Sequence, residues 1–540
     1  MEALAYESQQ LGHLGIIAGM CREIDLIGQI DTCIDQNERK VSVGQAVQAM
    51  IINALGFVDS PLYLTPEFFH NKPVEILIGR GLQAEDLNDD SLGRALDLLY
   101  KKGVTEVFAQ VASHALSISG IKHTTYHLDS TSISFEGEYN HQEDMQAIEI
   151  THGYSRDKRP DLKQAIVSLI CTYKSSIPVW LAVHSGNEVD KTLFPQLIDA
   201  YVKQLKGSPQ PYFVADSALY SAENLGMLSE KVKWISRVPE TIKEAKHLKE
   251  QTDVSTMSAE KEGYRLKEVF SEYGGIRQRW LLVFSLAAYK REEVSLQKRI
   301  GKELEKVQKE VWHLTNQVFP DKQAAEEADG KLQRKWSYHS LTVQYEPVYR
   351  YATRGHPKTG QQPQETLWKV VAEVREDHEK RQRAKKSLGK FILATNQLNS
   401  EEMSPESMLD VYKGQTVSVE RGFRFLKDPL FFASGLFLHK PQRIMSLLMV
   451  MGLSLLVYSL AERKLRLQLA QHHEFIPNQV GKPTQNPTLR RVFQVFRGIH
   501  LLIVKNTTAR EYKVLNLKPI HQTIIRLLGP HVENCYFFHL

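Results

Sequence analysis

The stretch TTYHLDSTSISFEG, residues 124–137, marks the point at which the pattern of the chain changes. Upstream of it, apolar residues recur at spacings of three and four, as in SVGQAVQAMIINALGF and SLGRALDLLYKKGVTEVFAQVASHAL, and this spacing predicts helices. Within it, apolar and polar residues alternate, which is typical of a β-strand with one buried face. The sequence therefore predicts a helical N-terminal domain, residues 1–120, followed by a sheet.

Further strand patterns follow downstream of this stretch. QAIVSLICTY and IPVWLAVHSG are strand-like, KTLFPQLIDAYVKQL has helical spacing, and PYFVADSALYS has strand character again. Strands in succession, and then helix and strand in alternation, favour an α/β fold with a mixed sheet flanked by helices.

The segment between residues 238 and 386 departs from that pattern. YRLKEVFSEYGGIRQRWLLVFS predicts a hairpin around Gly274 and Gly275, and REEVSLQKRIGKELEKVQKEVWHL predicts a long charged helix. GKFILATNQL then returns to strand character and is followed by another helix. We therefore predict a central domain interrupted by an α+β insertion and followed by a basic region: residues 121–237 with 387–470, residues 238–386, and residues 471–540.

Composition and charge place the chain among soluble globular proteins. It has 540 residues, of which 42% are hydrophobic and 24% charged, with a formal net charge of +5. Residues 461–540 alone contain twelve Lys and Arg against four Asp and Glu. Such a surplus is typical of a surface that faces phosphates, and on charge alone it fits a solvated basic surface equally well.

Cysteine usage and hydropathy exclude several classes of protein. Four Cys occur without a CxxC pair, which indicates neither a disulfide framework nor a zinc site and favours a reducing, cytosolic compartment. The N-terminus lacks the basic start and apolar run of a signal peptide. One uncharged run of seventeen residues, IMSLLMVMGLSLLVYSL at 444–460, lies at the lower limit for a membrane span. Its three Ser and one Gly favour a buried core helix, and we expect no membrane association.

Three acidic residues stand out by their context. Asp129 lies within the strand-like YHLDST, Asp216 follows the apolar end of PYFVAD, and Glu420 lies on a helix. Carboxylates are hard oxygen ligands that suit Mg²⁺ or Mn²⁺, and three of them can hold two ions for phosphoryl transfer. Among 63 acidic residues such spacing also arises by chance, but an Asp after a buried strand is costly unless it is paired or bound to metal.

The motifs around these acids carry a family resemblance. HLDST, VADSALYS and YKGQTVSVERGFRFLKDPLFF resemble the three acidic motifs of the DDE transposases of bacterial insertion sequences. HGYSRDKRPDLKQ, IPVWLAVHSGN and FILATN extend the resemblance over most of the chain beyond residue 120, and the helical N-terminal part is also similar. The resemblance implies an RNase H-like catalytic domain, with Asp129, Asp216 and Glu420 as the catalytic and metal-binding triad for two Mg²⁺ or Mn²⁺ ions.

The third motif resembles the Tyr-Arg-Glu-Lys signature of the wider superfamily, in which two, three and six residues separate the four positions. Tyr412 and Lys427 match, whereas Gln415 stands at the Arg position and is one residue further from the Glu than the signature requires. The resemblance implies that Lys427 contacts a DNA phosphate and that Arg421 or Arg424 supplies the charge missing at Gln415.

Other basic residues and partners follow from the same resemblance. Arg156, Lys158 and Arg159 in HGYSRDKRPDLKQ are predicted to contact the DNA backbone, although a solvated hairpin tip fits them nearly as well. The implied partner is double-stranded DNA, both terminal inverted repeats and target, bound by a homodimer in the nucleoid of the cytoplasm. The helical N-terminal domain is the expected reader of the repeats. An RNase H-like nuclease without strand transfer and a catalytically silent DNA-binding protein are the alternatives.

Overall fold

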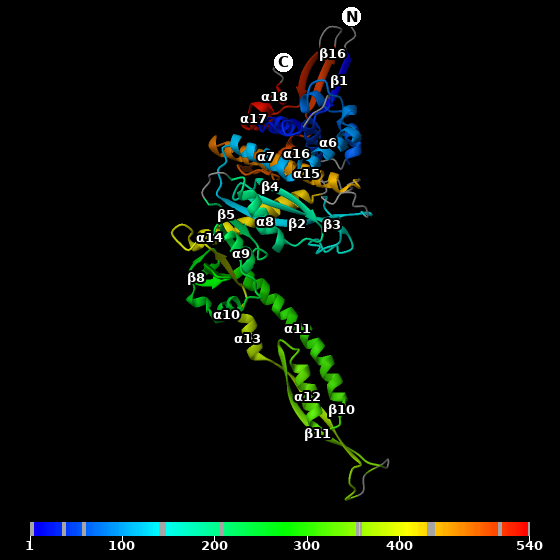
Figure 1. The fold of residues 1–540 in the computed structure, drawn as a ribbon, viewed down its shortest axis with the longest axis vertical. Helices are drawn as coiled ribbons and strands as arrows, with labels where there is room; N and C mark the ends of the chain where they lie inside the picture. The colour runs from blue at the N-terminus through cyan, green and yellow to red at the C-terminus, as the bar shows by residue number, and fades with distance from the viewer. Residues whose placement is uncertain are drawn as a thin grey trace. The chain divides into compact units, whose positions relative to one another are not determined.

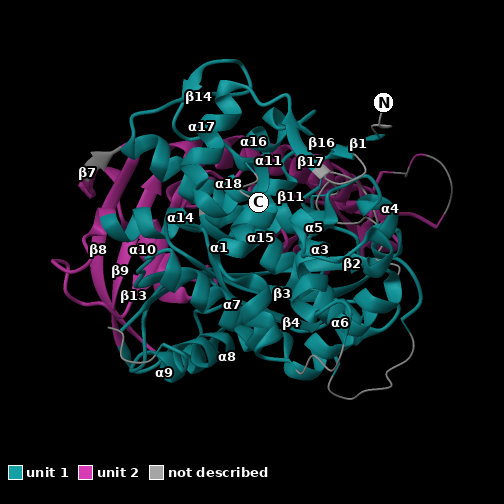
Figure 2. Ribbon diagram, turned by 90° about the horizontal axis from the view of Figure 1, so that it is seen from above, with its two compact units in different colours: residues 1–236, 274–276, 407–540 teal, residues 237–273, 277–406 magenta. Residues whose placement is uncertain are grey.

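The computed structural model of the chain has two compact units, coloured separately in Figure 2. Unit 1 comprises residues 1–236, 274–276 and 407–540, and unit 2 comprises residues 237–273 and 277–406. The structure describes residues 5–34, 39–56, 61–139, 147–205, 210–352, 356, 359–428, 438–505 and 510–537, without the side chains of 259–261, 417 and 510.

The central strands of unit 1 form a mixed sheet. They are β2 (Thr125–Phe135), β3 (Lys163–Thr172), β4 (Pro178–Ser185), β5 (Tyr212–Ala215) and β6 (Lys233–Arg237). Their order is β4-β3-β2-β5-β6, in which β2–β3 and β3–β4 pair antiparallel whereas β2–β5 and β5–β6 pair parallel. The parallel pairs are joined through helices α8 (Asp190–Val202) and α9 (Ala222–Leu228), as parallel connections require. The mixed RNase H-like sheet flanked by helices is therefore confirmed.

The predicted helical N-terminal region is also confirmed. Its helices are α1 (Leu14–Glu23), α2 (Leu26–Asp31), α3 (Val43–Ala54), α4 (Thr65–Phe69), α5 (Val74–Leu77), α6 (Asp89–Lys102) and α7 (Val104–Ile118). Helix α3 begins with a capping box, because Ser42 Oγ accepts the Gln45 N–H and the Gln45 side chain accepts the Ser42 N–H.

The two ends of the described chain pack together within unit 1. Strand β1 (Ala5–Gln10) pairs with β16 (His500–Lys505), which pairs in turn with β17 (Arg510–Leu515). The Tyr536 hydroxyl donates to Gly12 O at 2.7 Å, so the last helices lie against the first. The C-terminal helices of this region are α16 (Leu489–Val495), α17 (Pro519–Leu528) and α18 (Pro530–Tyr536), and a short pair of strands, β14 (Ile476–Pro477) and β15 (Pro483–Thr484), precedes them. The expected assignment of residues 1–120 and 471–540 to separate domains stays a prediction.

Helix α15 (Pro441–Gln471) is the core helix of unit 1. It packs on β4, α6 and α7, and Figure 1 shows it crossing beside α7 above the sheet. Gly452 marks the closest approach, since a Cβ there would lie 2.3 Å from Leu181 Cδ1 and 3.0 Å from Phe108 Cε2. The helix is long and apolar enough to cross a membrane, but 89% of its most apolar window is buried inside the protein. The run at 444–460 is thus a core segment, as predicted.

Unit 2 contains two sheets and several helices. One set of strands has the order β13-β9-β8-β7, and the other has the order β10-β12-β11. The strands are β7 (Ser258–Lys261), β8 (Tyr264–Tyr273), β9 (Ile276–Ser285), β10 (Val318–Phe319), β11 (His339–Arg350), β12 (Glu365–Glu376) and β13 (Lys390–Thr395). The helices are α10 (Lys243–Gln251), α11 (Leu286–Asn316), α12 (Lys322–Gln333) and α13 (His378–Lys386). Gly274 and Gly275 connect β8 and β9 with φ values of 63° and 76°, as the expected hairpin requires.

Candidate active site

Asp129 and Asp216 lie side by side on neighbouring parallel strands. The register of β2 and β5 pairs His127 with Val214, so residues 129 and 216 each follow that pair by two positions. Side chains two residues apart point to the same face of a strand, and adjacent strands lie about 4.8 Å apart. The two carboxylates that were predicted from separate motifs are therefore brought together by the sheet.

The environment of Asp129 disfavours its charged form. Burial raises the pKa of Asp129 to about 7, with Asp216 and Asp190 adding to the rise, while Arg156 and the Ser130 N–H oppose it. Only 17% of its side chain is exposed. A carboxylate in such a place gains from a nearby cation, because the cation offsets the loss of hydration.

Asp216 directly follows β5 and lies in the same partly buried, acidic environment as Asp129. Burial raises its pKa, the Ala218 N–H lowers it by donating to Oδ1 at 2.9 Å, and Asp190 raises it further. The backbone carbonyl of Asp216 accepts the Ser236 hydroxyl at 2.7 Å, which fixes the turn that follows β5. The side chain is thus held at the carboxyl end of a parallel strand, where ligands bind in α/β sheets.

Asp190, at the start of α8, is a member of the cluster that the sequence analysis missed. Its side chain accepts hydrogen bonds from Ser130 Oγ and from Arg156 Nη2. In the sequence, Asp190 is an Asp in the first turn of a predicted helix, and many helices begin with such a residue for structural reasons alone. Only the tertiary structure shows that this carboxylate faces the aspartates of β2 and β5.

Arg156 is the cation of the cluster. It lies in the connection between β2 and β3, with Nη1 3.4 Å from Asp129 Oδ1 and Nη2 paired with Asp190. The guanidinium therefore bridges two carboxylates, a pairing that the sequence motif did not predict when Arg156 was assigned to the DNA backbone. Both uses need the same property, a planar cation with several fixed donors.

Helix α14 (Pro405–Leu426) packs against the strand that carries Asp129. His127, on the same face of β2 as Asp129, donates from Nε2 to Val411 O at 2.8 Å, and its Nδ1 lies 2.9 Å from Ser418 Oγ. Gln415 donates to Leu128 O at 3.4 Å. The residue at the Arg position of the signature thus contacts the backbone next to Asp129.

Glu420 does not join the aspartates in this structure. Leu169 pairs with Asp129 across β2 and β3, and its Cδ1 lies 3.6 Å from the Cβ position of Gly422, two residues after Glu420. The Glu420 side chain is exposed. Within the described residues no three His, Cys, Asp or Glu side chains lie close enough to hold a metal ion. Two of the three predicted ligands are therefore assembled in this structure, and their all-oxygen chemistry fits a hard divalent cation.

Lys427 directly follows the last residue of α14, and its N–H donates to Phe423 O at 3.0 Å, so it lies about two helical turns beyond Glu420. Its Nζ pairs with Asp157 Oδ2 at 2.6 Å, beside Arg156 in the β2–β3 connection. The predicted phosphate contact is therefore brought to the loop that reaches Asp129. Tyr412 is half-buried and lies on α14 about two helical turns before Glu420.

The remaining predicted DNA contacts fall in two places. Lys158 and Arg159 are exposed in the β2–β3 connection, where Lys158 has a φ of 59° and Arg159 Nη2 pairs with Asp161 at 2.8 Å. Arg424 lies four residues, about one helical turn, after Glu420 and so shares its face of α14, whereas Arg421 lies roughly 100° around the helix from Glu420. Arg421 pairs with Glu462 of α15 rather than with the aspartate cluster.

Comparison with known proteins gives a family assignment for most of this site. Residues 121–457, more than half of the chain, match the model of the Transposase DDE domain. Residues 6–113 match a Domain of unknown function (DUF4277). A search of curated proteins gave no match.

One solved structure that resembles the chain is described as a piggyBac transposase synaptic complex with hairpin DNA. The alignment covers 95% of this chain and 85% of that chain, at 9% sequence identity and a TM-score of 0.39.

Proposed function

We propose, from the premise that the chain belongs to the DDE transposase family, that it cuts DNA at the ends of a bacterial insertion sequence and joins those ends to target DNA. Cleavage and joining of DNA are phosphoryl transfers, the reaction class of this family. The observation that carries the proposal is the pair of partly buried carboxylates, Asp129 on β2 and Asp216 directly after the adjacent parallel strand β5.

DDE transposases use divalent metal ions, and we propose Asp129, Asp216 and Glu420 as the ligands of two Mg²⁺ or Mn²⁺ ions. Such ions supply activation of the attacking oxygen and stabilisation of the leaving oxygen. The aspartates are held by the sheet, while Glu420 lies exposed on α14. Completion of the ligand set is therefore expected to accompany ion binding rather than to precede it.

The basic residues near the aspartates are proposed to hold the DNA backbone. Lys427 and Arg156 are now paired with Asp157 and with the aspartate cluster, so each is positioned beside the reacting centre. When the carboxylates bind a metal ion, the Arg156 guanidinium loses its present partners and becomes available to a phosphate. Lys158 and Arg159 extend the same loop.

Gln415 is proposed as a positioning residue in place of the Arg of the signature. It donates to Leu128 O at 3.4 Å and so ties α14 to the residue before Asp129. Tyr412 completes the signature on the same helix, and Arg421 and Arg424 supply positive charge from that helix.

The proposal includes the biological setting of the reaction. The N-terminal helical region would read the terminal inverted repeats, and a homodimer would hold both ends of the element in the cytoplasm, on the nucleoid. A DNase footprint on the repeats that survives deletion of residues 1–120 would show that another part of the chain reads them.

The central experiment is a strand-transfer assay with labelled element ends, target DNA and Mg²⁺. We expect cleaved and joined products from the wild type and neither product from Asp129→Asn, Asp216→Asn or Glu420→Gln. Asp161→Asn is the matched control, because Asp161 is an exposed aspartate in the β2–β3 connection that pairs with Arg159.

Other results of the strand-transfer assay would identify one of the two alternative functions or refute the triad assignment. Cleavage without joined product would assign a nuclease. DNA binding with no cleavage by the wild type would assign a catalytically silent DNA-binding protein. Cleavage that persists in Asp129→Asn would show that the triad assignment is wrong.

A further inference from the structure

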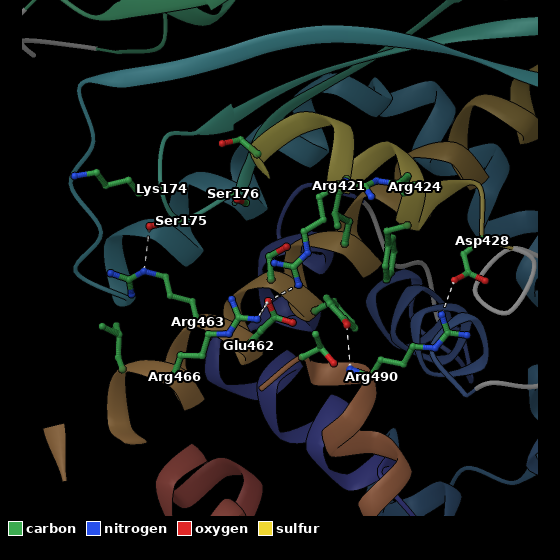
Figure 3. A pocket seen from close by; sticks show the side chains of 18 of the residues that line it. Lys174, Ser175, Ser176, Arg421, Arg424, Asp428, Glu462, Arg463, Arg466 and Arg490 are labelled. Atoms are coloured by element: carbon green, nitrogen blue, oxygen red, sulfur yellow. Dashed lines mark hydrogen bonds and ion pairs between the residues drawn. The ribbon is translucent and has the colours of Figure 1, made fainter. Parts of the chain in front are cut away.

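A cavity of about 730 Å³ lies in unit 1 beside α14 and α15, and Figure 3 shows it from close by. Its walls come from the turn between β3 and β4, from α14 and α15, and from the residues before α16. Its charged lining residues are six basic and two acidic: Lys174, Arg421, Arg424, Arg463, Arg466 and Arg490, with Asp428 and Glu462. The cavity thus has a surplus of four positive charges.

Glu462 organises the arginines of the cavity. It is 4% exposed, pairs with Arg421, and lies 2.8 Å from Arg466 Nη2; Figure 3 shows both arginines meeting at it. Its second oxygen accepts the Leu489 N–H at 2.8 Å. Because each carboxylate oxygen has partners, the Glu462 charge is satisfied, and it holds two guanidinium groups in fixed positions.

Arg490 and Arg463 are positioned from other elements. Arg490 Nη1 donates to Asp428 Oδ2 at 3.0 Å, and the Arg463 Nε–H donates to Ser175 Oγ at 3.2 Å. The arginines of the cavity are therefore oriented before any ligand arrives, which reduces the entropy lost when they bind one.

Part of this positive charge has no compensation. Within the described residues, Arg424 and Arg463 form no ion pair with a carboxylate. Burial lowers the pKa values of Arg463 and Arg466, and the neighbouring Arg421 lowers that of Arg466 further. An anion in the cavity would relieve both effects.

The lining indicates phosphates rather than bases. Its aromatic rings pack on each other, with the Phe425 and Tyr458 centroids 5.1 Å apart, and the Tyr458 hydroxyl accepts the Arg490 N–H. The arginines instead present planar forks of donors, which match phosphate oxygens.

We propose that this cavity binds the phosphodiester backbone of DNA at a site separate from the aspartate cluster. The inference rests on the proposed function, because it takes the ligand to be the DNA that the cluster cuts. Both sites share α14, which carries Glu420 as well as Arg421 and Arg424 of the cavity lining. A strand or duplex held at the cavity would therefore be held by the same rigid helix that carries the third catalytic acid.

The test is DNA binding as a function of salt, measured by fluorescence anisotropy with a labelled duplex in EDTA, so that no cleavage occurs. The variant is Arg424→Ala with Arg463→Ala, which leaves no carboxylate without its partner. We expect the slope of log affinity against log salt to fall by about 2, since each lost phosphate contact removes about 0.9. The loss should be equal for element-end and random sequences, because backbone contacts carry no sequence information.

Two controls accompany this measurement. Arg291→Ala with Arg299→Ala removes two exposed arginines of α11 and should leave the slope unchanged. Arg424→Lys with Arg463→Lys keeps the charges and should retain most of the slope. Thermal unfolding of each variant checks that the fold is intact.

The outcomes separate this inference from the proposed function. An unchanged slope in the double alanine variant, or an equal loss in the α11 control, would overturn the cavity as a DNA site even if the wild type cleaves and joins DNA. Tight binding of tripolyphosphate by calorimetry, lost in the double alanine variant while the DNA slope stays unchanged, would assign the cavity to a small phosphorylated molecule instead. Failure of Mg²⁺-dependent cleavage with a reduced slope in the variant would overturn the proposed function and retain the cavity as a DNA-binding site.

Discussion

Replacing Asp129 with Asn should stabilise the fold of the metal-free protein and abolish catalysis at the same time. Burial raises the pKa of Asp129 from its ordinary 3.8 to about 7. Between these values the native state holds a proton that the unfolded state has released, so the free energy of unfolding falls as pH rises. Each pKa unit corresponds to about 1.36 kcal/mol, so this one group costs about 2 kcal/mol at pH 5 and about 4 kcal/mol at pH 8.

Asn has the shape of Asp and no charge, so it removes this penalty. It can also keep the bond that Asp129 Oδ1 accepts from the Ser130 N–H at 2.8 Å. The stability gain of Asp129→Asn over the wild type should therefore grow by roughly 2–3 kcal/mol between pH 5 and pH 8. The assay is urea unfolding in EDTA, followed by circular dichroism at both pH values.

Added Mg²⁺ should reverse the order at pH 8. A ligand that binds only the native state raises the free energy of unfolding, and the wild type has the Asp129 carboxylate to bind it, whereas the variant does not. Asp161→Asn, at an exposed site, should show no gain that grows with pH. A stability loss in Asp129→Asn at pH 8 in EDTA would refute the reasoning, because it would show that the buried charge stabilises the native state.

Three further substitutions test other parts of the structure. Glu420→Gln should lower the cleavage rate by about a thousandfold, since metal-ion stabilisation of the transition state is worth several kcal/mol. The urea midpoint of this variant should equal that of the wild type, because Glu420 is exposed. Glu462→Gln should cost about 3 kcal/mol in the free energy of unfolding, because Arg421 and Arg466 lose a buried partner, and an unchanged midpoint would contradict this. Gly452→Val should lower the free energy of unfolding by about 1–3 kcal/mol or more, since the valine side chain would overlap Leu181 in the core. Gly301→Ala on α11 is the control and should show no such loss, because a Cβ there meets nothing within 4 Å.

The sequence predicted the elements of the fold well where patterning is local. The strand around Asp129, the long charged helix α11 and the core helix α15 all follow from the spacing of apolar residues, because a helix or strand must bury one face. The same patterning placed Asp216 at the end of a strand. The roles of Asp129, Asp216 and Glu420 stay predictions that came from motif resemblance rather than from periodicity.

The tertiary structure decided which distant residues meet. Asp190 and Arg156 join the aspartates only because β2, α8 and the β2–β3 connection converge, and no local signal distinguishes them from a helix-start residue and a solvated loop. Likewise, Glu462 and Arg466 are ordinary charges on a helix by sequence, yet folding places them with Arg421 in one cavity. Sequence patterning thus determined the elements and offered the acidic candidates, whereas the geometry of the charges depends on long-range contacts that only the folded chain establishes.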